Sequence, residues 1–486
     1  MTSCTHNIAG DYNDEETPLL VKKPRTPLPW FQLSIVLFLQ MAEPLTSQVL
    51  YPFGPQLMRD IGITHGDETK VGYYVGLMQS LFFFSQALTV MHWSSISDRI
   101  GRKPVILFGL VGLSLTMYGF GLSTTFTWLV LTRCLCGALN GNIGVIKSIM
   151  AEITDETNRA QMFAFVPMAW SAGGTLGPLV GGWLSRPAEG FPGLFGDSTF
   201  HKNHPYFLAC AVPATISLIA WFVTLFFLEE TVSSPVPVTQ FVRGDAGNEH
   251  LPEDCSDSSS ERTRADYREE SLHVSAVLTP RVLLASANYA LICLVDISFR
   301  ALQPVFFATP LDMGGLGFEP STIGMILSTY GILNCVFQLC FFAKIHSRIG
   351  TKRVMIMGLA AAVPGFALFP VMNAFGRRDA PSWLLWSLIL AQVGFLMLLN
   401  MTYGAIFIYV TASAPNKASL GTVNGFGQML VSLARTVGPA FTNSLFSMTM
   451  QHHYLSGLAV YIAVIGMTLF SISVARRLPQ RAWEAA

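Results

Sequence analysis

Apolar stretches long enough to span a membrane alternate with short polar turns along most of the chain. Six of them precede a long polar segment, at roughly 28–51, 72–93, 104–122, 127–150, 160–184 and 205–228. Six more follow it, at roughly 281–303, 322–343, 354–373, 382–411, 418–446 and 455–475. A helix needs about 20 mainly apolar residues to cross the roughly 30 Å hydrocarbon core of a bilayer. The pattern therefore predicts an all-α integral membrane protein with twelve transmembrane helices.

Composition and charge agree with a membrane location. Of the 486 residues, 51% are hydrophobic and 12% are charged, whereas soluble domains have about 25% charged residues. The formal net charge is zero and no basic face or arm stands out, which argues against a nucleic-acid partner. Placing both termini in the cytoplasm puts most Lys and Arg in cytoplasmic loops and tails, as the positive-inside rule requires. We expect a monomer that spans the lipid bilayer many times.

Three polar segments flank or divide the spans. Residues 1–27 and 229–280 are too poor in apolar residues to bury a core, so we predict a disordered cytoplasmic tail and a flexible cytoplasmic linker. Residues 477–486 form a second cytoplasmic tail. The chain thus divides into an N-terminal half at 28–228 and a C-terminal half at 281–476, each with six spans.

A short motif in the first tail bears on the membrane in which the protein resides. Residues 15–20 read EETPLL and resemble an acidic dileucine sorting signal of the kind that directs membrane proteins to a vacuole or lysosome. Such short motifs also arise by chance. A vacuolar membrane and a plasma membrane therefore both stay open.

A charged hairpin joins the second and third spans. The run WSSISDRIGRKP at 93–104 places fixed charges between two apolar stretches, and a glycine within it permits a tight turn. It resembles the pattern Gly-x-x-x-Asp-Arg-x-Gly-Arg-Arg/Lys in the loop between helices 2 and 3 of the major facilitator superfamily, with Ser94 at the place of the first glycine. Any cytoplasmic hairpin collects basic residues, but the whole pattern at this place favours the family. The matching residues are Asp98, Arg99, Gly101, Arg102 and Lys103.

The two halves carry similar patterns at equivalent places. The hairpin is echoed at 342–352, where Gly350 stands at the place of Gly101. A Gly-Pro pair at 177–178 in the fifth span is echoed at 438–439 in the eleventh. The resemblance implies the major facilitator fold, in which two pseudo-symmetric six-helix halves enclose a substrate site near the midplane of the bilayer.

Two acidic residues lie within spans, where a carboxylate costs about 2.5–3.5 kcal/mol on insertion scales. Glu43 is midway along the first span, and Asp296 occupies the matching place in the seventh. One acid from each half suggests a shared cavity, and a buried carboxyl group that binds and releases a proton is what a proton-coupled carrier requires. Two alternatives stay open. Arg300 lies one helical turn after Asp296 and could form a structural pair with it, and Glu43, next to Pro44, could bond the freed backbone of a broken helix.

Two isolated arginines also lie within spans. Arg133 opens the run RCLCGALNG in the fourth span, which resembles the Arg-x-x-x-Gly motif of proton-dependent members of the superfamily, and we expect it to face Glu43. Arg435 stands three residues before Gly438 in the eleventh span. Either arginine could act on a proton or a substrate, or could only pair with and position neighbouring helices.

Glycines recur in the fifth span at a spacing that places several of them on one helix face, where they let helix backbones touch. The run resembles the antiporter motif of drug and proton exchangers, Gly-x8-Gly-x3-Gly-Pro-x2-Gly-Gly, with Ala164 at the place of its first glycine. A generic contact between small residues is the alternative. The matching residues are Gly173, Gly177, Pro178, Gly181 and Gly182.

Further charges follow the fourth span, beside the hairpin. In the family, such loops bond one another in one conformation and separate in the other. The resemblance implies that Asp98 also faces the N-terminus of the eleventh span, where unpaired N–H groups favour an anion. A merely solvated loop is the alternative. The acidic residues that we expect to take part are Glu152 and Asp155.

The first six spans resemble the zinc-induced facilitator-like and tetracycline-exporter-like group of the superfamily. The resemblance is carried by PLPW at 27–30, Pro-Phe at 52–53 and the run 137–144. Plant members have a cysteine motif before the first span and a histidine motif after the sixth. The first is missing here and residues 228–231 match the second without its histidine, so a zinc-linked function is not implied.

These features predict a membrane carrier that exchanges protons for a small organic molecule by alternating access, most simply in the direction of efflux. A facilitator or symporter of the same fold and a sensor that transports nothing are the alternatives. We do not expect an enzyme, because no His-Asp pair, GxSxG motif or metal cluster lies near a membrane face. We expect no cofactor and no metal. The identity of the substrate is not readable from the sequence.

Overall fold

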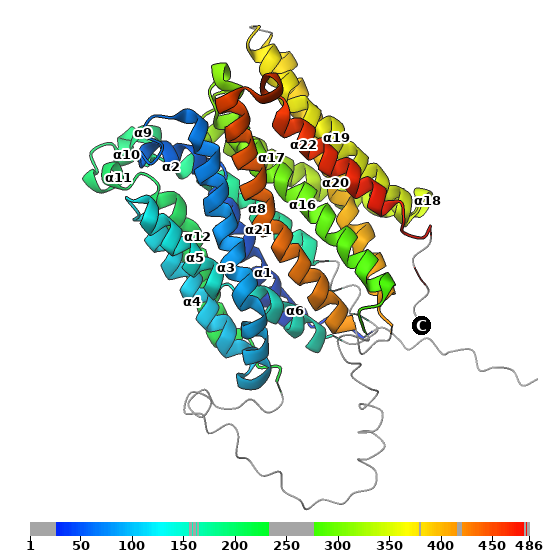
Figure 1. Cartoon of the computed structure of the whole chain (residues 1–486). Coiled ribbons are helices and arrows are strands. Elements are labelled where there is room, and N and C mark those ends of the chain that lie inside the picture. The colour runs from blue at the N-terminus through cyan, green and yellow to red at the C-terminus, as the bar shows by residue number, and fades with distance from the viewer. Residues whose placement is uncertain are drawn as a thin grey trace, which may run out of the picture.

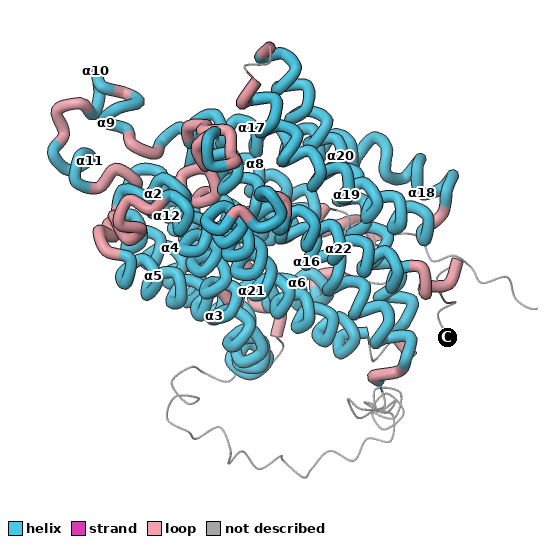
Figure 2. The backbone as a smooth tube through the Cα atoms, turned by 45° about the horizontal axis from the view of Figure 1, so that its top comes forward, coloured by secondary structure: helices cyan, strands magenta, loops and turns pink. Residues whose placement is uncertain are grey.

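A computed structural model describes residues 26–154, 158, 162, 165–232, 277–378, 381–415, 420–480 and 483. The dileucine motif, most of the linker and Asp155 lie outside these described residues. Figure 2 shows helices and loops but no strand in the described part of the chain. The helices run side by side as one bundle (Figure 1).

Six helical segments of the bundle belong to each half. Those of the N-terminal half are α1 (Trp30–Gln48), α3 (Val71–Ile100), α4 (Arg102–Gly121), α5 (Phe126–Leu139) with α6 (Asn142–Glu152), α8 (Val166–Leu184) and α12 (Phe207–Phe227). Those of the C-terminal half are α16 (Pro280–Ala308), α17 (Pro320–Phe337) with η4 (Gln338–Phe342) and α18 (Ala343–Ile349), α19 (Thr351–Gly376), α20 (Ser382–Ser413), α21 (Leu420–His452) and α22 (Ala459–Ala475). Each segment corresponds to one predicted span.

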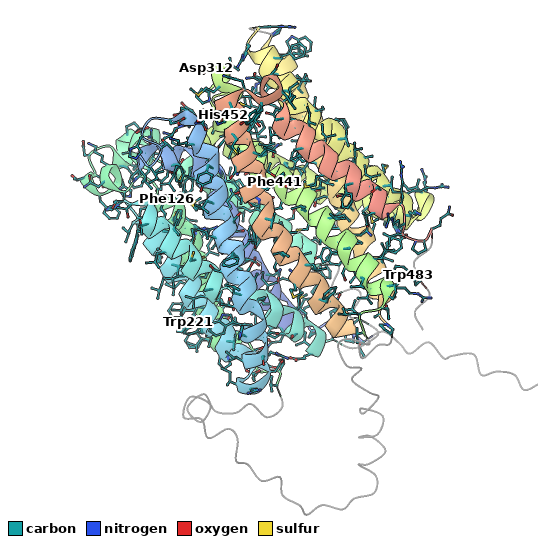
Figure 3. The ribbon with its side chains drawn as sticks, viewed as in Figure 1. Phe126, Trp221, Asp312, Phe441, His452 and Trp483 are labelled. Atoms are coloured by element: carbon teal, nitrogen blue, oxygen red, sulfur yellow. The ribbon has the colours of Figure 1, made fainter. Side chains whose placement is uncertain are left out.

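Short helices cover one end of the bundle, which we call the far end. They are α2 (Gly54–Asp60), η1 (Glu68–Lys70), α9 (Pro187–Gly190), α10 (Pro192–Phe195), α11 (Thr199–Asn203), η3 (Leu311–Met313) and η6 (Tyr454–Gly457). The opposite end, which we call the hairpin end, carries the turns at Gly101 and Gly350. Figure 3 shows Asp312 and His452 at the far end and Trp483 near the hairpin end.

The two hairpin turns have the same backbone geometry, which supports the equivalence of the halves. Gly101 has φ 103° and ψ 158°, and Gly350 has φ 82° and ψ 160°. Residues with a Cβ rarely adopt such positive φ values, so glycine is needed at both turns. In each case one long helix ends at the residue before the glycine and the next begins directly after it.

The predicted fourth span is broken in two. Asn140 and Gly141 separate α5 from α6, and the Trp93 side chain packs against Gly141 where a Cβ would otherwise lie. The Trp93 Nε1 donates to the carbonyl oxygen of Ala138 at 2.7 Å, and the Gln86 amide donates to that of Asn140 at 3.4 Å. Side chains from α3 therefore satisfy backbone groups near the break, as irregular backbone inside a membrane requires.

Hydropathy alone identifies most, but not all, of the helical segments as membrane-spanning. Seven helical segments of the described chain are long and apolar enough to cross a bilayer, and α3, bent by 42° near residue 91, raises the number to eight. The apolar α22 is only 17 residues long. Three further helices, α1, α8 and α21, are long enough to cross a bilayer but are less apolar than these segments. These three carry the polar and small residues that pack at or beside the interface between the halves.

The halves are packed together at the far end. Ser328 donates to the Thr175 carbonyl oxygen at 2.9 Å, and the backbone N–H of Ala440 donates to Ser80 at 2.9 Å. At the rim, the Arg59 guanidinium donates to the last carbonyl oxygen of α16, on Ala308, at 2.7 Å. Hydrogen bonds that join the halves within the described chain lie here or near the middle of the bundle; none lies at the two hairpin turns.

A glycine contact allows this closure. A Cβ on Gly182 of α8 would lie 2.6 Å from the carbonyl oxygen of Pro320 and 2.9 Å from the Cα of Gly324, both on or beside α17. These are backbone atoms, which cannot rotate away as a side chain can. The two helices can therefore approach this closely only if residue 182 has no side chain.

We predict that Gly182→Ala opens the far end. Overpacking of this kind costs about 1–3 kcal/mol, which changes a conformational equilibrium by roughly 5- to 150-fold. Spin labels at Lys202→Cys and Trp383→Cys, both exposed at the far end, would report longer distances in a background without native cysteines. Gly190→Ala is the control, since nothing lies within 4 Å of a Cβ at that position. Unchanged distances in the Gly182 variant would refute the role of this contact.

Candidate functional site

Glu43 lies beside a small cavity within the N-terminal half and is not held by a fixed counter-charge. It lines this cavity, between α1, α4 and α6, together with Gln40, Asn140 and Asn142. No ion pair of the described residues includes Glu43. The acid is thus surrounded by neutral polar groups rather than neutralised by a neighbour on its own helix.

Two cations face Glu43 from other helices. The charges of Arg435 on α21 and Lys147 on α6 both act on its carboxyl group, and Arg435 belongs to the opposite half. The Lys147 Nζ donates to the Oε1 of Gln428 on α21 at 3.2 Å, which makes it the hydrogen bond between halves that is nearest to the hairpin end. The Arg435 guanidinium lies over the ring of Phe83, 5.8 Å from its centroid. Movement of one half against the other would change the position of Lys147 relative to α21 and that of Arg435 relative to α1.

Asp296 forms an ion pair with Arg300, as the spacing of the two residues along one helix had suggested. The Arg300 Nε donates to the two carboxylate oxygens of Asp296 at 2.9 and 3.0 Å, and the Tyr403 hydroxyl donates to the second of them at 3.0 Å. Arg300 also donates to the hydroxyl oxygen of Tyr330 at 3.0 Å, and Asn400 donates to the same oxygen. Both charges are thereby satisfied within the C-terminal half.

A second cavity lies between the halves beside this network. Gln48 and Tyr51 of the N-terminal half line one side of it, and Arg300, Gln303 and Tyr330 of the other half line the opposite side. The two acids that the sequence places at equivalent positions therefore border separate cavities. Of these two acids, only Asp296 forms an ion pair with a described residue.

Arg133 does not contact Glu43, contrary to the expectation from sequence. It packs against the rings of Phe82 and Phe120, with its guanidinium carbon 4.5 and 5.9 Å from their centroids. It is only 3% exposed, and its Nε and Nη1 have no hydrogen-bond partner among the described residues. The reason is position along the helix. α5 starts at the far end, so a residue in its second turn meets aromatic side chains of α3 and α4 rather than the middle of α1.

The glycines of α8 serve two different contacts. Gly173, Gly177 and Gly181 face α1, where a Cβ on each would meet backbone atoms between residues 41 and 49. Gly182 faces α17 of the other half. The helix therefore fixes α1, which carries Glu43, and also closes the far end.

Arg102 is the centre of a charge network at the first hairpin. Its guanidinium donates to the carboxylate of Asp98, to the hydroxyl of Ser97 at 2.7 Å and to the carboxylate of Glu152 at 2.8 Å. Arg102 has 9% of its side chain exposed and Asp98 has 60%. Arg99 is exposed and forms no ion pair with the described residues.

Asp98 does not reach the eleventh span in this conformation. Its charge partner is Arg102, in the same half, and no contact with the described part of α21 is present. The residues just before that helix, at 416–419, lie outside the described chain. The far end is closed here, so the expected contact of Asp98 stays a prediction for an arrangement in which the hairpin ends approach each other.

Glu230 holds the hairpin and was not identified from sequence. Its carboxylate accepts hydrogen bonds from the backbone N–H groups of Arg102 at 2.8 Å and Lys103 at 3.0 Å, at the start of α4. It also accepts from the N–H groups of Thr231 at 3.1 Å and Val232 at 3.2 Å. An anion at a helix N-terminus is favoured by the orphan N–H groups and the helix dipole. The signal in the sequence was the position of this acid directly after an apolar span, but its partner is 128 residues away in the chain.

The second hairpin is held by opposite chemistry. The Lys352 Nζ donates to the carbonyl oxygens of Arg476 at 2.7 Å and Leu478 at 2.5 Å, after the end of α22. In each half, the start of the third helix is thus bonded to the end of the sixth. The first half uses an acid and backbone N–H groups, and the second half uses a cation and carbonyl oxygens.

A charge cluster at the far end fastens the short helices. Asp60 accepts hydrogen bonds from the Arg186 Nη2 at 2.6 Å and from the hydroxyl of Tyr206. Hydrogen bonding to Asp60 raises the pKa of the Arg186 guanidinium, and burial raises the pKa of the Tyr206 phenol. Arg186 stays charged and Tyr206 neutral at physiological pH, so this cluster is a structural fastening.

Comparisons with known proteins place the geometry in a known family. A sequence profile described as Major Facilitator Superfamily matches residues 36–439. The efflux pump azaK of Aspergillus niger is 27% identical and aligns over 93% of this chain and 89% of its own length. Protein ZINC INDUCED FACILITATOR 1 of Arabidopsis thaliana is 27% identical over 88% of this chain and 86% of its own.

One solved structure shows the same fold. A bacterial homologue of the human lysosomal transporter Spinster, in an inward-facing and occupied conformation, superposes with a TM-score of 0.62 over 95% of this chain and 100% of that chain. The sequence identity is 14%, so the likeness concerns the fold alone.

We predict that Glu230→Gln destabilises the protein through the hairpin. Hydrogen bonds to a charged group contribute about 1.5–3 kcal/mol, and losing that charge at the start of α4 should lower the melting temperature by several degrees. The matched control is Glu229→Gln. Glu229 is exposed and its side chain has no ion pair in the described chain. Equal melting temperatures for the two variants would show that Glu230 contributes nothing as a cap.

Proposed function

The chain belongs to the major facilitator superfamily and is a multi-pass membrane transporter rather than an enzyme, and on this premise we propose that it exports a small organic molecule in exchange for protons. Relatives named as efflux and drug-resistance proteins support the direction. The fold supports alternating access, since closure at one end and separation at the other can be exchanged by rocking the halves. We place both termini in the cytoplasm, so that the hairpin end faces the cytoplasm.

The position of Glu43 is the main observation in support of proton coupling. An opposite charge near a carboxyl group favours its ionised form. For Glu43 one such charge, Arg435, is supplied by the other half. Its proton occupancy would therefore follow the movement of the halves, which is how a binding step is coupled to a conformational change.

Asp296 has a different part in this proposal. Its charge is balanced by Arg300 one turn away, and Tyr403 completes the pair. A pair satisfied within one half does not change when the halves move as rigid bodies. We therefore assign the proton to Glu43, and to Asp296 and Arg300 the positioning of α16, α17 and α20.

We predict that Glu43→Gln abolishes transport driven by a pH gradient and leaves exchange between two pools of substrate intact. Reconstituted protein would first be screened with small organic molecules under an imposed pH gradient, and the variant would then be measured in both modes. Glutamine keeps the size and hydrogen bonds of the side chain and removes only the proton site. Persistence of the wild-type response to pH would favour the facilitator of the same fold.

Asp296→Asn is the matched comparison in the same assay. Breaking a buried ion pair costs about 3–5 kcal/mol because the remaining charge, here Arg300, is left unbalanced. We expect a lower melting temperature and a loss of both transport modes together. Selective loss of the pH-driven mode in this variant would move the proton assignment from Glu43 to Asp296.

The N-terminal tail offers a test of which membrane contains the protein. The motif at 15–20 lies outside the described residues, so its role rests on the sequence alone. We predict that Leu19→Ala combined with Leu20→Ala moves a fluorescent fusion from an internal acidic compartment to the cell surface. An unchanged distribution would reject the sorting signal and favour export across the plasma membrane.

A further inference from the structure

The charges between the halves do not balance. Lys147 from α6 and Arg435 from α21 face one acid, Glu43 from α1. Asp296 and Arg300, beside the second cavity, neutralise each other. One positive charge remains when Glu43 is ionised, and two remain when it is protonated.

Neither of these cations has an anionic partner in the described chain. The ion pairs formed by the described residues include neither Lys147 nor Arg435. Lys147 bonds only the neutral amide of Gln428, and Arg435 lies over the ring of Phe83. Both side chains are partly exposed and lie within membrane-spanning helices, where a cation is costly unless an anion pairs with it or water solvates it. The two side chains come from opposite halves, so a group bound to both would join the halves.

We propose that the substrate is a small amphoteric molecule whose anionic group binds between Lys147 and Arg435 and whose basic group binds Glu43. This inference rests on the proposed function and names the class of molecule that it moves. A carboxylate or a phosphate would satisfy the two cations, and a protonated amine would satisfy the acid.

The exchange of protons requires the basic group. A purely anionic substrate competes with ionised Glu43 for the two cations, so it binds best when Glu43 is protonated, and proton and substrate would then travel together. A basic group competes with the proton for Glu43 itself. Exchange for protons requires a basic group, and pairing of the two cations requires an anionic group. Only a molecule that carries both groups meets the two requirements.

Aromatic side chains near the site indicate which apolar group a probe molecule should carry. The ring of Tyr289 packs edge-on against Tyr403, at 6.4 Å between centroids, and against Phe407, at 5.3 Å. The Tyr289 and Tyr403 side chains lie within electrostatic range of Arg435, which places these rings near the unbalanced cation. Aromatic ligands are therefore the first choice.

The test compares three charge types on one skeleton. One set consists of phenylalanine, 3-phenylpropionate and 2-phenylethylamine, and a second set of tryptophan, indole-3-propionate and tryptamine. Binding to the purified full-length protein is measured by ligand-dependent thermal stabilisation, without a pH gradient. In at least one set we expect the amphoteric compound to bind at least about tenfold more tightly than the other two.

Variants separate the two charges. Lys147→Gln and Arg435→Gln should weaken binding of the amphoteric and the acidic compound by at least about tenfold, and Lys147→Arg should retain binding. Glu43→Gln should weaken binding of the amphoteric compound and leave that of the acid unchanged or stronger. Lys202→Gln, which removes an exposed cation at the far end, is the control for net charge.

Three results would overturn the proposal. They are binding of the amine as tight as that of the amphoteric compound, unchanged affinity in both cation variants, and no stabilisation by any of the six compounds. Binding is read here without turnover. Loss of proton exchange with these affinities intact would therefore refute the proposed coupling and leave the ligand class standing.

Discussion

A charge inside a bilayer must be paired, neutralised or solvated, and two pairs of intramembrane residues in this protein meet this requirement in different ways. Asp296 and Arg300 solve it locally, with two hydrogen bonds between them and a third from Tyr403. Glu43 and Arg435 do not, since they stand on opposite halves. The first pair makes a half of the protein rigid. The second pair makes the charge balance depend on how the halves are arranged.

The contact between halves depends equally on the absence of side chains. On α8, three glycines press one face against α1, and Gly182 brings another face against α17. The same helix thus fixes Glu43 within its half and forms part of the seal at the far end. Flexible glycine-rich segments would not do this, but glycines within a regular helix give a smooth surface along which backbones can meet and separate.

The sequence predicted the twelve segments well, because the hydropathy of a span depends only on residues that are consecutive in the chain. It did not predict the break at Asn140 and Gly141, since an apolar run continues through it and Trp93, which packs there, is distant in sequence. Spacing along one helix identified the Asp296 and Arg300 pair as an alternative. It could not place Arg133, whose neighbours Phe82 and Phe120 come from other helices.

The site was predicted in part for the same reason. Isolated charges in apolar spans pointed to Glu43 and Arg435, which lie on opposite halves of the protein. The part of Lys147 could not be predicted from the sequence, because its partner Gln428 lies on α21. Glu230 resembled an ordinary residue at a membrane boundary. Its importance comes from a tertiary contact that no local pattern contains.

That contact has a consequence for synthesis. The first N–H groups of α4 are bonded by a carboxylate that follows it by 128 residues. When a ribosome has made α4, the residue that completes its N-terminus has not yet been translated, and those groups must remain hydrated at the membrane surface. The hydrogen bonds that fix the first hairpin to the end of the sixth helix can therefore form only after residue 230 has been made, which is after all six helices of the N-terminal half have been translated.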